Sequence, residues 1–238
     1  MIKMMEHTVC GVSRAPHTRH THMRKRKYTA LCNTDTPHMN ADPCGDIPVP
    51  QIHNIVSTAL IESDHMPLDL DAIRQVIPGT SYDKKRFAAM TIRMHNPTCT
   101  ILLFSSGRMV VTGGKYWHES VCVCLSLRRL LQERLIGSDF RVHRCAIENI
   151  VAHVELNPPP GKQLNLDAMY THLNLHCTYD RKMFPGLIYR PTAFPVVFLC
   201  FHSGKIVITG GKSTSDVYRG WERMCPTISA FVLPIQSA

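Results

Sequence analysis

The chain has 238 residues, a formal net charge of +9 at pH 7 and a pI near 9.2. This length allows one large domain or two smaller ones, and the positive charge favours an anionic partner, nucleic acid before a membrane surface. No apolar stretch approaches the roughly 20 residues needed to cross a bilayer, and the N-terminus lacks the apolar segment of a secretion signal. We therefore expect an intracellular protein whose ten cysteines stay reduced.

Residues 1–48 are expected to form a disordered basic tail, because their prolines and histidines follow no sustained apolar period. The run RKRK at 24–27 suits a nuclear import signal or a loose phosphate-binding arm, and a solvated charge run explains it equally well. Cys122 and Cys124 do not have the spacing of a zinc site. We therefore expect no metal and no cofactor.

From residue 51 the predicted order is strand, helix, three strands and helix, and the same order then repeats. The first cycle has strands at 51–61, 85–95, 99–105 and 108–112 and helices at 68–77 and 119–135. The second has strands at 140–156, 187–192, 196–201 and 205–209 and helices at 164–175 and 215–231. The sequence thus predicts an α+β fold of two tandem repeats, 49–145 and 146–238.

Two twelve-residue stretches, FSSGRMVVTGGK from Phe104 and FHSGKIVITGGK from Phe201, are nearly identical. A phosphate-binding loop needs a glycine five residues before its Gly-Lys pair, where this chain has Met109 and Ile206. The offset of 97 residues between the copies recurs elsewhere in the chain. This duplication predicts one pseudo-symmetric body rather than two independent domains.

The predicted strands carry apolar residues on both faces. In the strand 99–105, Leu102 and Phe104 alternate with neighbours that are equally apolar, and in the second repeat we assign Leu199 to one face and Val197 to the other. Two helices per repeat suffice to cover one face of the sheet. The other face suits the minor groove of bent A·T-rich DNA, and it equally suits a tight dimer or a second protein layer.

Five stretches resemble the TATA-box-binding protein family and occur in the order found there: VPQIHNIVSTA, KRFAAMTIRM, FSSGRMVVTGGK, FPGLIYR and SGKIVITGGK. The resemblance covers about residues 48–232. It implies a pseudo-twofold saddle, in which a curved antiparallel sheet carries helices on its convex face. It also implies a nuclear general transcription initiation factor, not an enzyme, that kinks A·T-rich promoter DNA from the minor groove and nucleates the preinitiation complex.

The resemblance assigns DNA contacts to both repeats. The intercalating side chains are Phe87, Phe104, Phe184 and Phe201. Minor-groove contacts are expected from Asn54, Val56, Leu102, Val110, Thr112, Asn149, Val151, Pro185, Leu199, Val207 and Thr209. Phosphate contacts, which fix register without reading sequence, are expected from Arg93, Arg108, Lys115, Arg190, Lys205 and Lys212.

The implied partners are double-stranded promoter DNA, general transcription factors of the A and B type, TBP-associated factors and the RNA polymerase machinery, with no membrane and no small-molecule substrate. Docking of protein partners is expected at Asp180 and Lys182, before the FPG motif, and at Arg128 and Arg129 on the long helix. A DNA-processing enzyme of similar fold is the remote alternative, but the strands carry no apparent nucleophile and base pair.

The chain also departs from the family pattern. His53 and Glu148 stand where the family usually has glutamine, and Lys182 reverses an acidic position. Leu125 and Ser126 replace basic residues of the long helix. These departures leave open a divergent TBP-related factor with altered DNA preference or polymerase partner.

Overall fold

The computed structural model describes residues 47–235. The predicted tail 1–48 and its RKRK run therefore lie outside the described residues, apart from Ile47 and Pro48. The elements in chain order are β1 (Gln51–Ser63), α1 (Leu70–Val76), β2 (Thr80–Ser81), β3 (Ala89–His95), β4 (Thr98–Phe104), β5 (Arg108–Gly114), α2 (Trp117–Arg134), β6 (Phe140–Glu155), β7 (Lys162–Leu164), α3 (Leu166–Leu173), η1 (Asn174–His176), β8 (Cys177–Thr178), β9 (Leu187–Tyr189), β10 (Val197–Cys200), β11 (Lys205–Gly211), α4 (Thr214–Ser229) and β12 (Val232–Pro234).

One ten-stranded antiparallel sheet joins the two repeats. Its strand order is β2-β3-β4-β5-β1-β6-β11-β10-β9-β8, so the halves mirror each other about the β1–β6 pair. That central pair extends from Gln51 opposite His153 to Ser63 opposite Phe140. The predicted pseudo-symmetric α+β body is confirmed; the exact division into 1–48, 49–145 and 146–238 stays a prediction.

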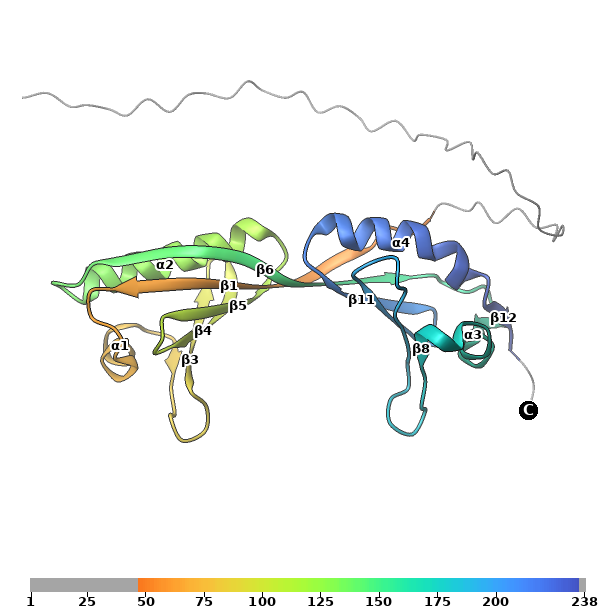
Figure 1. Cartoon of the computed structure of the whole chain (residues 1–238), viewed down its shortest axis with the longest axis horizontal. Coiled ribbons are helices and arrows are strands. Elements are labelled where there is room, and N and C mark those ends of the chain that lie inside the picture. The colour runs from red at the N-terminus through yellow and green to blue at the C-terminus, as the bar shows by residue number, and fades with distance from the viewer. Residues whose placement is uncertain (1–46, 236–238) are drawn as a thin grey trace, which may run out of the picture. The chain divides into compact units, whose positions relative to one another are not determined.

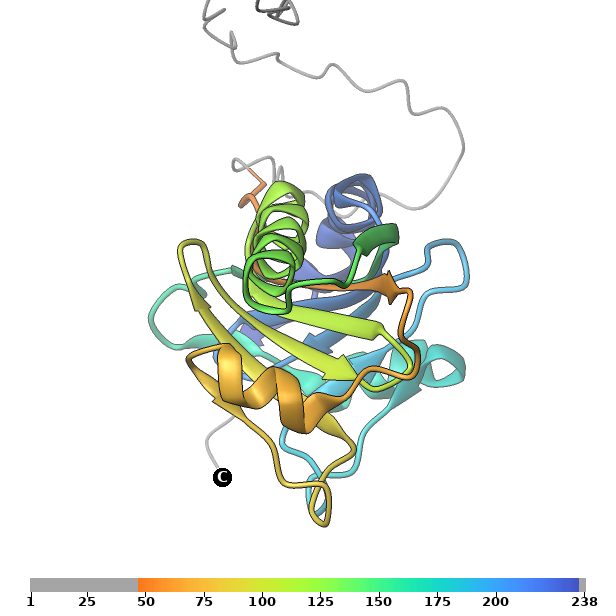
Figure 2. The same ribbon diagram turned by 90° about the vertical axis from the view of Figure 1, so that its left-hand side faces the viewer.

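Each repeat has its own apolar core between the sheet and its helices. Val123 and Leu127 of α2 are fully buried in the first core, and Trp221 of α4 is buried in the second. Figure 1 shows α2 and α4 on the convex side of the sheet, with α1 and α3 at its outer ends. Figure 2, turned by 90°, shows α2 and α4 on the same side of the strands, and Figure 1 shows each over its own half of the sheet. None of the helices within residues 47–235 has the length and apolarity needed to span a membrane.

The duplicated GGK segment forms the same turn in both repeats. Gly113 and Gly210 have φ of 99° and 93°, which favours glycine because a side chain there is strained. Beyond the turn, the Glu119 carboxylate accepts hydrogen bonds from the backbone N–H groups of residues 115 and 116. Asp216 does the same for residues 212 and 213. Each segment therefore ends a strand and begins a capped helix.

Three details of the predicted strands were wrong. The strand expected at 85–95 begins only at Ala89, because Asp83 organises residues 83–87 into a turn: its side chain accepts from the Lys85 N–H and its carbonyl from the Phe87 N–H. The strands expected at 187–192 and 196–201 are shorter, and β2, β7, β8 and β12 were not predicted. Val197 lies on the same half-buried face as Leu199, since side chains two residues apart share a face.

Candidate nucleic-acid interface

The face of the sheet opposite α2 and α4 is half-buried and continuous across both repeats. Within residues 47–235 no helix covers it (Figure 1). It carries the predicted sheet residues Asn54, Val56, Leu102, Val110, Thr112, Asn149, Val151, Leu199, Val207 and Thr209, all partly exposed. Most of their neighbours along the strands are buried under the helices. Each strand is therefore apolar on both sides, and one side lacks a partner.

Backbone pairing brings the predicted residues into a compact, pseudo-symmetric array. At the centre, Asn54 lies opposite Val151 and Val56 opposite Asn149. Toward the two ends, Leu102 pairs with Val110 and Leu199 with Val207; these positions are equivalent in the two repeats. The result is an apolar strip with two asparagines at its middle.

The two asparagines are held in one orientation. Asn54 Oδ1 accepts hydrogen bonds from the Gly113 N–H at 2.7 Å and the Thr112 hydroxyl at 3.1 Å. Asn149 Oδ1 accepts from the Gly210 N–H at 2.7 Å and contacts the Thr209 hydroxyl at 3.2 Å. Because a backbone N–H fixes each oxygen, the amide nitrogen is the end that can donate to a ligand. Asn149 Nδ2 also donates to the Thr209 hydroxyl at 3.1 Å, which leaves one of its two N–H groups for a ligand.

The four predicted phenylalanines form two ring pairs. Phe87 and Phe104 have centroids 6.3 Å apart at an interplanar angle of 66°, and Phe184 and Phe201 have centroids 5.7 Å apart at 68°. Phe87 is 50% exposed and the other three rings are partly exposed. The structure thus brings together side chains that are distant in sequence into one edge-to-face pair in each repeat.

Gly186 packs against the second ring pair, a contact that the sequence did not reveal. A Cβ at this position would lie 2.7 Å from Phe184 Cε1 and 2.9 Å from Phe201 Cε1. The equivalent position in the first repeat holds Ala89, which is buried. Pro185, predicted to support the Phe184 ring, is exposed in the same loop. The lack of a side chain at Gly186 therefore leaves room for both rings to pack against the backbone at this position.

The six predicted cations are all exposed, at or near the ends of strands: Arg93, Arg108, Lys115, Arg190, Lys205 and Lys212. Lys212 differs from the others because its Nζ lies 3.1 Å from Glu148 Oε2. Among the described residues, none of the other five forms an ion pair. Exposed cations beside an apolar strip bind polyanions by releasing counterions.

In the loop that precedes β9, the acidic residue Asp180 has a structural role. The Asp180 carboxylate accepts a hydrogen bond from the Lys182 N–H at 2.9 Å, as Asp83 does for Lys85 in the first repeat. Lys182 itself is exposed, and Met183 is 83% exposed. The predicted docking residue Asp180 therefore also shapes the turn that presents its neighbours.

His202 is the one residue that changes character between the duplicated stretches, and the structure explains it. Its Nε2 lies 3.2 Å from the Tyr179 hydroxyl and its Nδ1 3.1 Å from the Leu164 carbonyl oxygen. The same hydroxyl accepts a hydrogen bond from Arg181 Nε at 2.8 Å. His202 thus ties the loop around Arg181 to the sheet, a role that Ser105 does not have.

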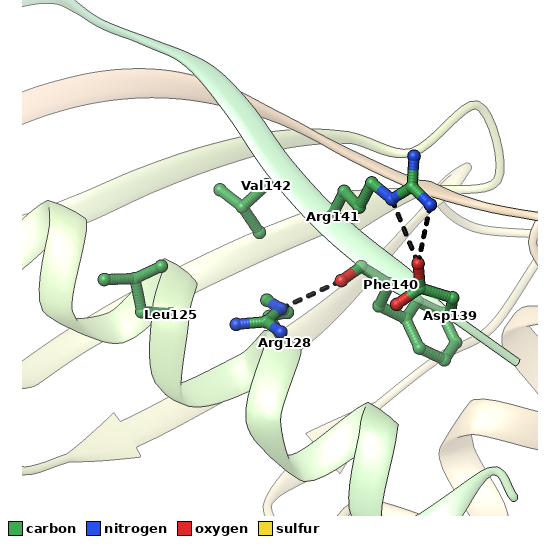
Figure 3. Close-up of a pocket in the computed structure, with 6 residues that line it drawn as sticks. All are labelled: Leu125, Arg128, Asp139, Phe140, Arg141 and Val142. Atoms are coloured by element: carbon green, nitrogen blue, oxygen red, sulfur yellow. Dashed lines mark hydrogen bonds and ion pairs between the residues drawn. The ribbon is translucent and has the colours of Figure 1, made fainter. Parts of the chain in front are cut away.

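The basic residues of α2 lie on the convex surface. Arg128 Nε donates to the Phe140 carbonyl at 2.9 Å, and Arg129 pairs with Glu133 at 2.7 Å. Figure 3 shows Arg128 at a cavity of about 380 Å³ between α2 and the start of β6, with Leu125 and the Arg141–Asp139 pair nearby. Leu125 is 48% exposed. This part of α2 presents an apolar side chain next to arginines.

Comparison with known proteins gives a consistent result. The family model described as "Transcription factor TFIID (or TATA-binding protein, TBP)" matches residues 49–133 and 144–231. TATA box-binding protein-like 2 of Rattus norvegicus is 36% identical over 201 residues, 84% of this chain and 56% of the relative. The TATA-box-binding protein of Dictyostelium discoideum is 36% identical over 202 residues, 83% of this chain and 93% of the relative.

A solved structure supports the same assignment. Methanococcus jannaschii TBP aligns with a TM-score of 0.64 and 30% identity, covering 77% of this chain and 99% of that one. The chain spans about half the length of the rodent relatives it matches, 56% of the rat protein and 50% of the mouse protein.

Proposed function

Since the chain belongs to the TATA-binding protein family of transcription factor TFIID, we propose that it binds the minor groove of A·T-rich, TATA-like promoter DNA with the half-buried face of its sheet. It then kinks the duplex and nucleates a preinitiation complex in the nucleus. The chain is a transcription factor and not an enzyme.

The proposal rests mainly on the fixed asparagines at the centre of the apolar strip. In the minor groove, A·T pairs present only acceptors, N3 of adenine and O2 of thymine. The amide donors of Asn54 and Asn149 match those acceptors. The valines and leucines around them carry no hydrogen-bonding side-chain group, which suits a groove floor without donors. A G·C pair places its N2 amino group on the groove floor, where this apolar strip leaves that donor unpaired.

Phenylalanine intercalation is proposed from the paired rings. Each pair supplies an exposed aromatic edge at one end of the strip, and apolar wedges of this kind unstack a base step and bend the duplex. Pro185 and the hydroxyls of Thr112 and Thr209 complete the groove contacts. The cations Arg93, Arg108, Lys115, Arg190, Lys205 and Lys212 meet the flanking phosphates.

A bending assay tests this proposal. A doubly labelled A·T-rich duplex is mixed with the native protein, with the Phe104→Ala/Phe201→Ala variant, and with Phe231→Ala as a control. Phe231 is an aromatic residue packed beside His172, away from the ring pairs. We expect the double variant to lose the bend and the control to keep it. A double variant that binds and bends like the native protein overturns the intercalation.

A TBP-related factor with altered protein partners is the second candidate function, and the side chains of Lys182 and Leu125 favour it. A cation at 182 and an apolar side chain at 125 change the surfaces on which A-type and B-type factors, TBP-associated factors and the polymerase machinery are proposed to dock. We expect Lys182→Glu to tighten docking of a B-type factor on the protein–DNA complex, with Lys84→Glu, in the corresponding loop of the first repeat, as the control. Equal affinity of native protein and Lys182→Glu counts against the charge argument.

A further inference from the structure

Two clusters of polar side chains are related by the pseudo-symmetry of the sheet, and each contains residues from both repeats. The first consists of His53, His153, Lys115 and Lys205, and the second of Glu148, Thr58, Lys212 and Arg108. His53 corresponds to Glu148, His153 to Thr58, Lys115 to Lys212 and Lys205 to Arg108. We call them the histidine cluster and the glutamate cluster. The equivalent positions 53 and 148 hold a base in one cluster and a carboxylate in the other, although pseudo-symmetry predicts the same chemistry.

In the glutamate cluster, both carboxylate oxygens of Glu148 have partners. Oε1 accepts a hydrogen bond from the Thr58 hydroxyl at 2.8 Å, and Oε2 lies 3.1 Å from Lys212 Nζ. The Thr58 bond, followed by the Lys212 bond and charge, lowers the pKa of Glu148, so the group is an anion at neutral pH. Arg108 adds a further favourable charge. Lys212 is thus already ion-paired with a carboxylate of the protein itself.

Among the described residues, no carboxylate forms an ion pair with the histidine cluster; Glu155 lies opposite Lys205 in the β6–β11 pair but is not ion-paired with it. The rings of His53 and His153 have centroids 4.0 Å apart at 33°. Burial, then the charges of His153, Lys115 and Lys205, lower the pKa of His53, and all three of these neighbours are bases. Neighbouring bases that form no ion pair within the protein are the arrangement that an external anion stabilises.

We propose that Glu148 is an affinity-determining residue that competes with a DNA backbone phosphate for Lys212, so that the protein binds the two halves of its DNA site unequally. This inference rests on the proposed DNA-binding function. A phosphate approaching the glutamate cluster meets a carboxylate of like charge and a lysine that is already paired. A phosphate at the histidine cluster meets Lys115 and Lys205, neither of which forms an ion pair, with Glu155 opposite Lys205 as the one nearby carboxylate in the strand register. The histidine cluster therefore carries the larger share of counterion release.

The expected effect of freeing Lys212 follows from polyelectrolyte behaviour. Each phosphate neutralised by a lysine changes the slope of log affinity against log salt by about 0.9. Glu148→Gln retains a side-chain oxygen for Thr58 and removes the competing charge. We expect this variant to steepen the slope by about one and to bind about two- to fivefold more tightly near physiological salt, the scale of an exposed ion pair.

The experiment titrates the full chain against an A·T-rich duplex by fluorescence anisotropy, between about 50 and 200 mM salt. The variants are Glu148→Gln, Lys212→Ala, the double variant, and Glu222→Gln on α4, which makes the same change in net charge on the convex side. We expect the gain from Glu148→Gln to disappear in the Lys212→Ala background and to be absent in Glu222→Gln. The mirror variant His53→Glu places a carboxylate in the histidine cluster, and we expect it to flatten the slope by about one.

The outcomes separate this inference from the proposed function. If the native protein does not bind the duplex, both fall. If the native protein binds but Glu148→Gln leaves affinity and slope unchanged, or gains equally without Lys212, only the competition is wrong. Should Glu148→Gln fail to fold by circular dichroism, His53→Glu decides, because an unchanged slope in that variant overturns the inequality of the two clusters.

Discussion

Replacing Gly186 by alanine tests whether the spacing of the second ring pair governs DNA binding. The new Cβ would lie 2.7 Å from Phe184 Cε1 and 2.9 Å from Phe201 Cε1. Carbon atoms pack best at about 3.5–4.0 Å, so each ring has to retreat by roughly 1 Å. In the first repeat, where Ala89 takes the equivalent place, the ring centroids are 6.3 Å apart rather than 5.7 Å. We therefore expect the variant to spread the second pair toward the spacing of the first.

The cost in folding should be small. Overpacking typically destabilises by about 1–3 kcal/mol, and the reduced freedom of the unfolded chain returns about 0.4–1 kcal/mol. Both rings are partly exposed and can turn about two side-chain torsions, so the low end applies. We expect unfolding in urea to show a net loss of about 1 kcal/mol or less.

The loss of DNA affinity should be larger in Gly186→Ala than in a control variant that overpacks the core. A displaced wedge fits its base step less well, and a loss of about 1 kcal/mol corresponds to about fivefold weaker binding. Gly220→Ala is the control, because its Cβ would meet Val196 Cγ2 at the same 2.7 Å but inside the α4 core. Anisotropy gives the affinity, energy transfer gives the bend, and a crystal structure gives the ring spacing.

Two results refute this reasoning. If Gly186→Ala spreads the rings while bend and affinity match the native protein, ring spacing is irrelevant and the wedge argument fails. If Gly186→Ala and Gly220→Ala weaken DNA binding equally, the effect belongs to general destabilisation and not to the rings.

Three further substitutions test other parts of the site. Asn54→Asp keeps an oxygen for the Gly113 N–H but removes the donor and adds a charge, so anisotropy should show at least about tenfold weaker DNA binding, a loss of about 1.4 kcal/mol; an unchanged affinity contradicts the donor role. Hydrogen bonds from the Tyr116 and then the Lys115 N–H lower the pKa of Glu119, so its stabilisation is present above its ordinary pKa and is lost as pH falls through the lower folded value. Glu119→Ala should therefore unfold in urea about 1 kcal/mol more easily than the native protein at about pH 7, and a difference that does not shrink as the pH is lowered argues against the cap. His202→Ser should lose about 1 kcal/mol and speed hydrogen exchange in residues 179–183; native-like exchange there would show that the ring does not hold the loop.

Part of the half-buried face follows from strand alternation. Alternation predicts that Leu102 shares a face with Phe104 and that Val207 shares one with Thr209, and the burial pattern agrees. The same rule requires Val197 to share the face of Leu199, so its prediction on the opposite face is wrong. The late start of β3 was a different kind of error, since a strand-like composition at 85–88 is overridden by the Asp83 turn.

Other features depended on contacts between residues far apart in sequence. The sequence showed that Glu148 departs from its family but not that it pairs with Lys212, and it showed that His202 differs from Ser105 without indicating Tyr179 as the reason. The close approach of Gly186 to two rings was equally hidden. No local pattern carries such information, because each contact requires the sheet to be assembled first.

By itself, the sequence determined the duplication, the order of the longer strands and helices and the apolar character of both sheet faces, because these depend on periodicity and on recurrence at a fixed offset. The quoted motifs indicated the family. Only the tertiary structure decided the spacing of the ring pairs, the orientation of Asn54 and Asn149, and the inequality of the histidine and glutamate clusters. The physical reason is that these properties are set by distances of a few ångströms across the β1–β6 junction and between neighbouring strands. Such distances exist only after both repeats have closed into one sheet.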